Sequence, residues 1–220
     1  AHRAMSAAID KAEASGVGMI TVRNGCHFGA HAYFVDMAAA HDMVAMTMSH
    51  TMPSAVAPGG RDRVVGTNPL GIGVPSGDDH HFVLDMATTA ISGTRAMFAA
   101  RSGEPLPWGV AVDADGAITT DPTASRSGGA LLPLGSTAES GGAKGLGLAL
   151  VVDLLSGLMS GTGSGLHQSY GPEWAQGYWF LAFRVDLFTD PDEFRREVAA
   201  TNDVVRNSRL ADGADPVRVP

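Results

Sequence analysis

The alternation of apolar and polar residues predicts a chain that mixes helices with strands. Apolar residues recur at helical spacing over 1–14 and 30–42, and strand-like apolar runs cover 19–22 and 43–49. Two strands that flank a helix form a βαβ-like unit. Two short strands between residues 70 and 88, joined by a turn, are expected to follow.

The second half of the chain predicts longer elements. Residues 144–161 are apolar nearly all round, which favours a buried helix over a surface one. A strand is expected over 177–188, and then an amphipathic helix with Asp190 as its cap and Pro191 at its first position. The sum is an α/β chain without a regular βαβαβ series.

A long connection separates the predicted βαβ-like unit from the strands that follow it. Residues 50–69 are dense in proline and glycine, which argues against regular structure over most of the segment. Connections of this length inside a compact domain are usually functional or mobile. We therefore expect this segment to be functional or mobile.

Composition narrows the class of protein. The 220 residues are 45% hydrophobic and 17% charged, enough for a folded core. The net charge of −8 and the scattered basic residues argue against nucleic acid as a partner. No apolar run has transmembrane length, and a single cysteine fits a reducing cytoplasm. The ends look like those of an internal portion of a longer chain.

Glycine-rich segments do not match dinucleotide fingerprints. Gly161–Gly165 follows a predicted helix, whereas a Rossmann G-x-G-x-x-G must follow a strand and open a helix. Gly71–Gly73 lies inside a predicted strand, and the glycines around Lys144 lack the Gly-Lys-Ser/Thr order of a phosphate loop. A bound nucleotide would have to be held in another way.

The stretch from Val22 to Phe34 contains the first chemical candidates. His27 lies where a strand gives way to a helix, and residues alone leave open whether it is an acid/base or a packed core histidine. His31 would share a helix face with His27, but a zinc site needs a third ligand, and none is evident. For Cys26, a buried inert thiol is the favoured interpretation.

Two further residues each allow two interpretations. Lys144, just before the long apolar helix, could cap a loop or reach a phosphate or carboxylate. Asp85 ends an apolar strand and could bind a ribose hydroxyl or cap the following helix, with Thr88 and Thr89 as competing caps.

Four phrases in this order resemble the malate/L-lactate dehydrogenase family of NAD(P)-dependent oxidoreductases: "VRNGCHFGAHAYF", "GTNPLGIGVP", "FVLDMATT" and "GGAKGLGLALVVDLLSGLMSG". The resemblance covers nearly the whole chain. It implies an α/β fold with a mixed, non-Rossmann sheet, like L-sulfolactate dehydrogenase, in one oxidoreductase domain over residues 1–220. It also implies NAD or NADP as cofactor, a small 2-hydroxy acid or 2-keto acid as substrate, and a homodimer.

The resemblance also assigns roles to individual residues. His27 matches the family's proton acceptor. Residues that match cofactor-binding positions are Thr51, Asp85, Met86, Ala87, Lys144 and Gly145, and those expected near the site are Thr67, Asn68 and Pro69. No metal is expected.

Departures from the family pattern support one rival hypothesis, and the His27/His31 pair supports a second. Cys26 stands where the family commonly has a polar neighbour, and the family's N-terminal segment, with its Ser-His-Gly motif and nearby arginine, precedes the first residue here. The substrate-carboxylate arginine therefore cannot be assigned to Arg61 or Arg63. The rivals are a truncated, inactive fold that binds nucleotide or dimerises, and a metal hydrolase built on His27 and His31.

Overall fold

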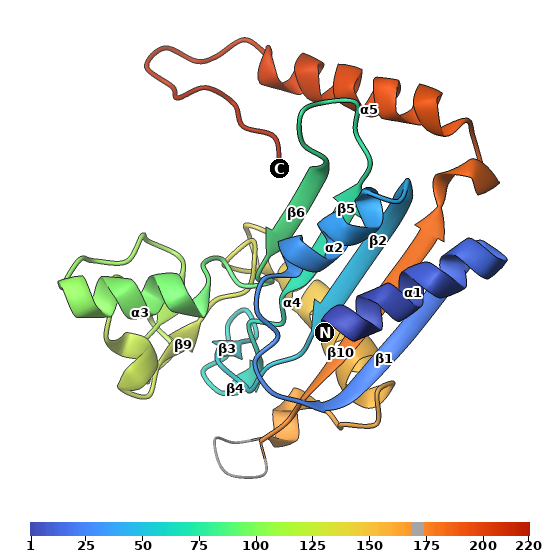
Figure 1. Cartoon of the computed structure of the whole chain (residues 1–220). Coiled ribbons are helices and arrows are strands. Elements are labelled where there is room, and N and C mark those ends of the chain that lie inside the picture. Colours follow the sequence, from blue (N-terminus) through green and yellow to red (C-terminus); the bar gives the residue numbers. More distant parts are fainter. Residues whose placement is uncertain (169–173) are drawn as a thin grey trace.

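A computed structural model describes residues 1–168 and 174–220. Figure 1 shows a larger twisted sheet with helices on both faces and a smaller lobe at one edge. The strand order of the larger sheet is β1-β10-β2-β5-β6, and every neighbouring pair is antiparallel. The bounds of these strands are β1 Val17–Gly25, β2 Met43–Ser49, β5 Leu70–Val74, β6 Phe82–Met86 and β10 Gln176–Arg184.

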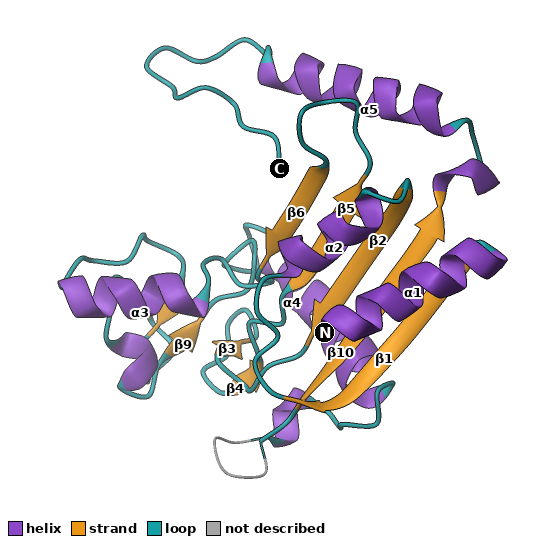
Figure 2. Cartoon of the chain, viewed as in Figure 1, coloured by secondary structure: helices purple, strands orange, loops and turns teal. Residues whose placement is uncertain are grey.

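Helices cover both faces of this sheet, as Figure 2 shows. On one face, α1 (His2–Ser15) and α2 (His31–Ala39) pack through their apolar sides against Phe180, Met43 and their neighbours. On the other face lies α4 (Gly142–Val152), which continues into a π-helical segment, Asp153–Leu158. The inner strands β2 and β10 are buried on both faces, which explains their nearly continuous apolar runs.

The predicted βαβ-like unit is present, but its two strands are not neighbours. β1 and β2, which the sequence joins through α2, run in the same direction, and β10 lies between them. Tyr178 of β10 pairs with Val22 on one side and with Ser49 on the other. A segment near the end of the chain therefore forms an inner strand of the sheet.

The smaller lobe contains a second sheet and α3 (Gly93–Ser102). Its strand order is β4-β3-β9-β7-β8, and β3 and β9 form a parallel pair. Its bounds are β3 Ala55–Val56, β4 Arg63–Val65, β7 Ala111–Val112, β8 Ile118–Thr119 and β9 Ala130–Leu131. The connection 50–69, predicted to be mostly irregular, thus contributes two short strands.

Side chains cap the N-termini of two α-helices, α5 (Pro191–Arg206) and α3. Asp190 caps α5 by accepting a hydrogen bond from Glu193 N–H at 2.9 Å, so the predicted cap and first-turn proline are confirmed. Ser92 caps α3 by accepting from Arg95 N–H at 3.1 Å. Thr88 and Thr89, expected as caps, instead donate to main-chain carbonyls.

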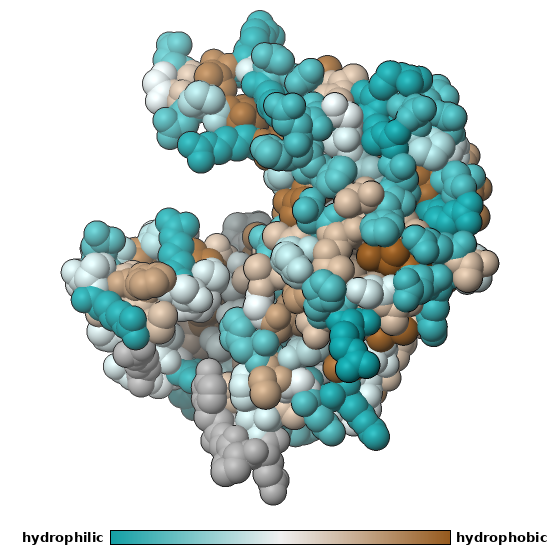
Figure 3. Space-filling view, viewed as in Figure 1, coloured by the Kyte–Doolittle hydropathy of each residue, from teal (hydrophilic) through white to brown (hydrophobic). Residues whose placement is uncertain are grey.

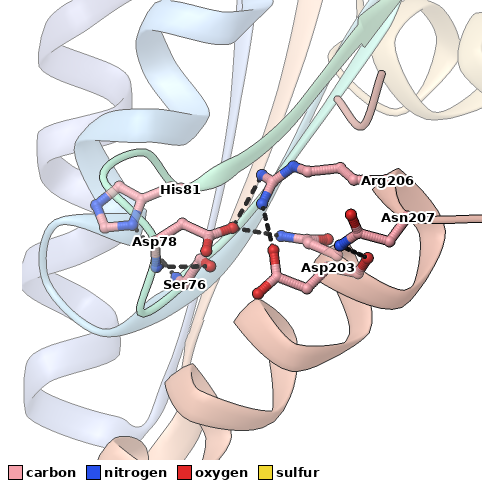
Figure 4. Close-up of polar contacts among 7 residues, drawn as sticks. Ser76, Asp78, His81, Asp203, Arg206 and Asn207 are labelled. Carbon is pink, nitrogen blue, oxygen red and sulfur yellow. Dashed lines mark hydrogen bonds and ion pairs between the residues drawn. The ribbon is translucent and has the colours of Figure 1, made fainter. Parts of the chain in front are cut away.

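Polar contacts tie α5 to the turn between β5 and β6 (Figure 4). Asp78 accepts hydrogen bonds from Arg206 Nη2 at 2.9 Å and from Asn202 Nδ2 at 3.1 Å. The bond from Arg206 lowers the pKa of Asp78 below its usual range. In Figure 3 a deep notch separates the part that carries α5 and the C-terminal segment from the lobe with α3.

The prediction of a fully buried helix over 144–161 is wrong for one side of that helix. Its inner side packs through small residues, among them Gly145 and Ala149. Its outer side leaves Leu150, Leu154 and Leu158 between 44% and 52% exposed. Apolar composition all round does not guarantee a neighbour on every side, and the described residues leave about half of each of these three leucines uncovered.

The predicted α/β class with a non-Rossmann sheet is confirmed; the parallel pair that makes a sheet mixed lies in the smaller one. Among the described residues, every helix is too short or too polar to cross a membrane.

Candidate functional site

A cavity of about 660 Å³ gathers most of the predicted site residues. That volume lies in the range of small-molecule and cofactor sites. Its walls come from the segment after β1, the ends of β2 and β6, the start of β10 and the first turn of α3. The predicted residues that line it are His27, Thr51, Thr67, Pro69, Asp85, Met86 and Ala87.

His27 is exposed to this cavity, and a backbone contact holds its ring. Nδ1 of His27 accepts a hydrogen bond from Gly29 N–H at 3.0 Å. A neutral imidazole that accepts at Nδ1 carries its proton on Nε2. An imidazolium donates from both nitrogens, so protonation at Nδ1 requires this bond to break.

His31 forms part of the core beneath His27. It is 1% exposed, stacks on Phe28 with ring centroids 4.0 Å apart, and contacts Thr47 Oγ1 at 2.8 Å and Ser49 Oγ at 3.1 Å. Burial lowers the pKa of His31 to about 4, so the ring is neutral near pH 7. Both ring nitrogens already face hydroxyls, which leaves neither free to bind a zinc ion together with His27.

Asp85 supports the segment that carries His27. Its Oδ2 accepts a hydrogen bond from Ala32 N–H at 2.9 Å, across 53 residues of sequence. Ala32 is the second residue of α2, whose N-cap position, Ala30, has no side-chain acceptor. Asp85 therefore caps an earlier helix rather than the following one, and its carboxylate interacts favourably with the positive end of that helix. Its other oxygen accepts no hydrogen bond from the described residues.

Thr51 is held by a buried amide. Asn68 is fully buried, accepts from Thr51 N–H at 2.9 Å and donates to Ala149 O of α4 at 2.9 Å. The Thr51 and Thr67 hydroxyl oxygens lie 3.3 Å apart at the cavity wall. The predicted Thr67–Pro69 turn thus lies at the site, but Asn68 lies beneath the cavity and positions the hydroxyls from there.

Lys144 and Gly145 do not line the cavity. Lys144 is exposed in the first turn of α4. Gly145 is buried, and a Cβ atom there would lie 2.1 Å from Leu134 O, so close packing of α4 on that backbone accounts for the glycine. The cofactor role that the family resemblance gives these two residues stays a prediction.

Arg63 lines the cavity but is engaged elsewhere. Its Nε donates to Gly129 O at 3.0 Å, and its Nη2 donates to Gly129 O and Ser125 O. The guanidinium thereby ties β4 to the loop between β8 and β9 of the same sheet. Arg61 is exposed and is not among the lining residues. Neither arginine has a geometry that assigns it to a substrate carboxylate.

Cys26 is exposed, so the expectation of a buried thiol is wrong. Its carbonyl oxygen accepts a hydrogen bond from Tyr178 Oη at 2.9 Å. The tyrosine ring passes over Gly25, where a Cβ atom would lie 2.2 Å from Tyr178 Cζ. This contact of β10 with the end of β1 turns the Cys26 side chain outward and fixes the start of the segment that carries His27.

The first turn of α3 forms another part of the cavity wall. Ser92, Gly93 and Thr94 line the cavity. Main-chain N–H groups in the first turn of a helix lack intrahelical acceptors, and the helix dipole makes that end positive. Such a wall is suited to a phosphate or carboxylate group.

Sequence reasoning missed the contribution of β10 to the cavity. Gln176, the first residue of β10, and Trp174 just before it both line the cavity. Gln176 is 4% exposed, and its Oε1 has no hydrogen-bond partner in the described part of the chain. Alternation could have indicated it, because Gln176 has the same parity as Tyr178 and Phe180.

Comparison with known proteins adds a family match. The model of the malate/L-lactate dehydrogenase family matches residues 1–220. Malate dehydrogenase from Pyrococcus abyssi is 36% identical over 211 residues, which are 94% of this chain and 58% of that protein. L-sulfolactate dehydrogenase from Methanothermobacter thermautotrophicus is 37% identical over 212 residues, 94% of this chain and 60% of that protein.

A solved structure is similar over the whole fold. The crystal structure of malate dehydrogenase from Entamoeba histolytica superposes with a TM-score of 0.93 at 30% identity, and covers 99% of this chain and 63% of that one. The chain therefore spans about three fifths of the length of the relatives it matches.

Proposed function

The chain belongs to the malate/L-lactate dehydrogenase family, and we propose that the protein transfers hydride between NAD(P) and a small 2-hydroxy or 2-keto acid. One observation carries the proposal. A single cavity brings His27, the hydroxyls of Thr51 and Thr67, and Asp85 with Met86 and Ala87 together from distant parts of the sequence. These are the residues for which the family resemblance implies a proton acceptor and cofactor contacts.

His27 is the proposed acid and base. During oxidation of a 2-hydroxy acid it accepts the hydroxyl proton, and during reduction of a 2-keto acid it returns that proton to the forming alkoxide. General acid/base catalysis of this kind contributes roughly 10²–10⁴-fold. Because Nδ1 is occupied by Gly29 N–H, proton acceptance at Nδ1 displaces that bond.

The cavity walls fit a nicotinamide dinucleotide. The first turn of α3 offers unpaired N–H groups for a diphosphate, the hydroxyls of Thr51 and Thr67 suit ribose hydroxyls, and Met86 and Met97 provide apolar surface. When bound, the cofactor accepts or supplies the hydride. Asp85 would orient it through the carboxylate oxygen that does not cap α2, and Lys144 would bind its phosphates from outside the cavity.

Two further features belong to the proposal. The family resemblance supports a homodimer, which light scattering on the purified protein tests. The single cysteine supports a cytoplasmic location. The structure offers no unambiguous partner for a 2′-phosphate among the described residues, so the proposal names both NAD and NADP.

The test is a panel of 2-keto acids assayed with NADH and with NADPH. We expect loss of reduced cofactor with at least one small 2-keto acid and its reversal with the matching 2-hydroxy acid. The native full-length gene product should be used, and its intact mass measured in parallel. A full-length product that oxidises neither cofactor with any acid, yet still binds nucleotide, would favour the inactive-fold hypothesis.

A further inference from the structure

Gln176 presents an unused acceptor to the proposed site. Its side chain is 4% exposed, it lines the cavity, and its Oε1 has no partner among the described residues. A buried acceptor without a partner costs free energy, and native proteins rarely leave one unless a ligand or water completes it. The position therefore points to a group in the ligand that donates a hydrogen bond.

The register of β10 places this amide beside the proposed reacting end. Gln176 pairs across the sheet with Gly25, two residues before His27. The ring of Tyr178 fills the space beside Gly25, where a Cβ atom would lie 2.2 Å from Tyr178 Cζ. Gln176 also shares a sheet face with Tyr178, whose ring contacts Phe28 at a centroid distance of 4.9 Å. Phe28 directly follows His27, and His27, Phe28 and Gln176 all line the same cavity.

One part of the proposed cofactor site lies farther along the sheet. Asp85 and Met86 belong to β6, and β2 and β5 separate β6 from β10 in the strand order. The first turn of α3 follows β6 in the chain and forms the wall on that side. In the strand order Gln176 is therefore closer to the segment that carries His27, which follows β1, than to Asp85 and Met86 of β6.

We propose that Gln176 is a specificity-determining residue whose carboxamide accepts a hydrogen bond from a hydroxyl or N–H group on the substrate carbon next to the reacting carbon. The inference rests on the proposed function and names its substrate class. Acids that carry such a donor are preferred over acids with an alkyl group there. A methyl group leaves Oε1 unpaired, and sites built to bind a polar group discriminate against analogues that lack it.

The experiment compares hydroxypyruvate with pyruvate, which differ by one hydroxyl on that carbon. The native full-length protein is assayed with excess reduced cofactor as wild type, as Gln176→Met and as Gln168→Met. Methionine has nearly the length of glutamine but no hydrogen-bonding amide. Gln168 is the control, because it is a glutamine that does not line the cavity.

We expect Gln176→Met to lower the ratio of kcat/KM for hydroxypyruvate to that for pyruvate by roughly tenfold, the value of one neutral hydrogen bond. Gln168→Met should leave the ratio unchanged. Calorimetric titration measures binding without cofactor turnover. In Gln176→Met, the ratio of the affinity for glycerate to that for lactate should fall by the same factor. Unchanged melting temperatures would show that both variants fold.

Three results would overturn the inference: a ratio that Gln176→Met does not change, an equal loss for both acids, or a loss confined to NADH affinity. The equal loss would mean that Gln176 only shapes the cavity, and the last result would assign it to the cofactor. Failure of the proposed function is separate, because the wild-type protein would then neither reduce nor bind any acid of the panel.

Discussion

The backbone N–H of Gly29 donates to Nδ1 of His27 across 3.0 Å. Gly29 has φ +93°, a conformation that glycine adopts without strain. That turn aims its N–H back at the ring two residues earlier. The contact orients the imidazole and selects the tautomer with the proton on Nε2.

Replacing His27 with glutamine should lower kcat by about 10²–10⁴-fold, because the proposed proton acceptor is lost. Cofactor affinity and the denaturant midpoint should stay unchanged, since the side chain is exposed. Steady-state kinetics, fluorescence titration of NADH and urea unfolding give the three values. His80→Gln, an exposed histidine in the β5–β6 turn, is the matched control. A His27→Gln protein with wild-type turnover would refute the assignment.

Replacing Asp85 with alanine should lower the free energy of unfolding by about 0.5–2 kcal/mol, the usual value of a helix cap. The reason is the bond from Ala32 N–H to Oδ2, which caps α2. Asp85→Asn keeps an acceptor and should lose less. Urea unfolding measures both variants against Asp79→Ala, an exposed aspartate elsewhere. An Asp85→Ala protein as stable as wild type would mean that α2 needs no cap.

Stability should fall as the pH is lowered from about 6.5 towards 4. Burial lowers the pKa of His31 from 6.5 to about 4, so within this window the unfolded chain binds a proton that the folded chain excludes. The free energy of unfolding then rises with pH by up to about 1.4 kcal/mol per unit. Above the unfolded pKa the effect is complete and the dependence disappears.

Urea unfolding of wild type and His31→Gln across this window isolates the contribution. The slope should shrink in the variant without vanishing, because burial also lowers the pKa of His50. Equal slopes in the two proteins would show that His31 is accessible to protons in the folded state.

Two glycines of α4 should respond to alanine in opposite directions. At Gly145 a Cβ atom would lie 2.1 Å from Leu134 O, and overpacking of this kind typically costs about 1–3 kcal/mol. At Gly147 nothing lies within 4 Å of the added atom, so alanine should stabilise the helix by roughly 0.5–1 kcal/mol. Thermal or urea unfolding compares the pair directly. Equal shifts would contradict the packing seen between α4 and the 134–136 backbone.

Local pattern predicted most elements of the fold. Helical spacing marked α1, α2 and α5, and Asp190 with Pro191 marked the start of α5 correctly. The order of the sheet could not be read locally, because β10 inserts between two strands that the sequence joins through α2. Exposure of Leu150 and Leu154 depends likewise on whether another element covers α4, which composition does not encode.

The residues of the candidate site that belong to motifs could be predicted from the sequence. The residues that long-range contacts bring to the site could not. His27 and Asp85 came from the family phrases, and the structure places both at one cavity. That Asp85 caps α2 depends on a contact across 53 residues. Gln176 lies just before the strand predicted over 177–188, and the register with Gly25 brings it to the site.

The position of β10 also decides when the protein can fold during synthesis. Chains emerge from the ribosome N-terminus first, so β1 and β2 are both made long before the strand that pairs with each of them. The nascent chain must wait for residues 176–184 with two unpaired strand edges open, and such edges are prone to aggregate. Gln176 begins that strand, so the ligand-binding corner is completed only when the last strand of the sheet arrives.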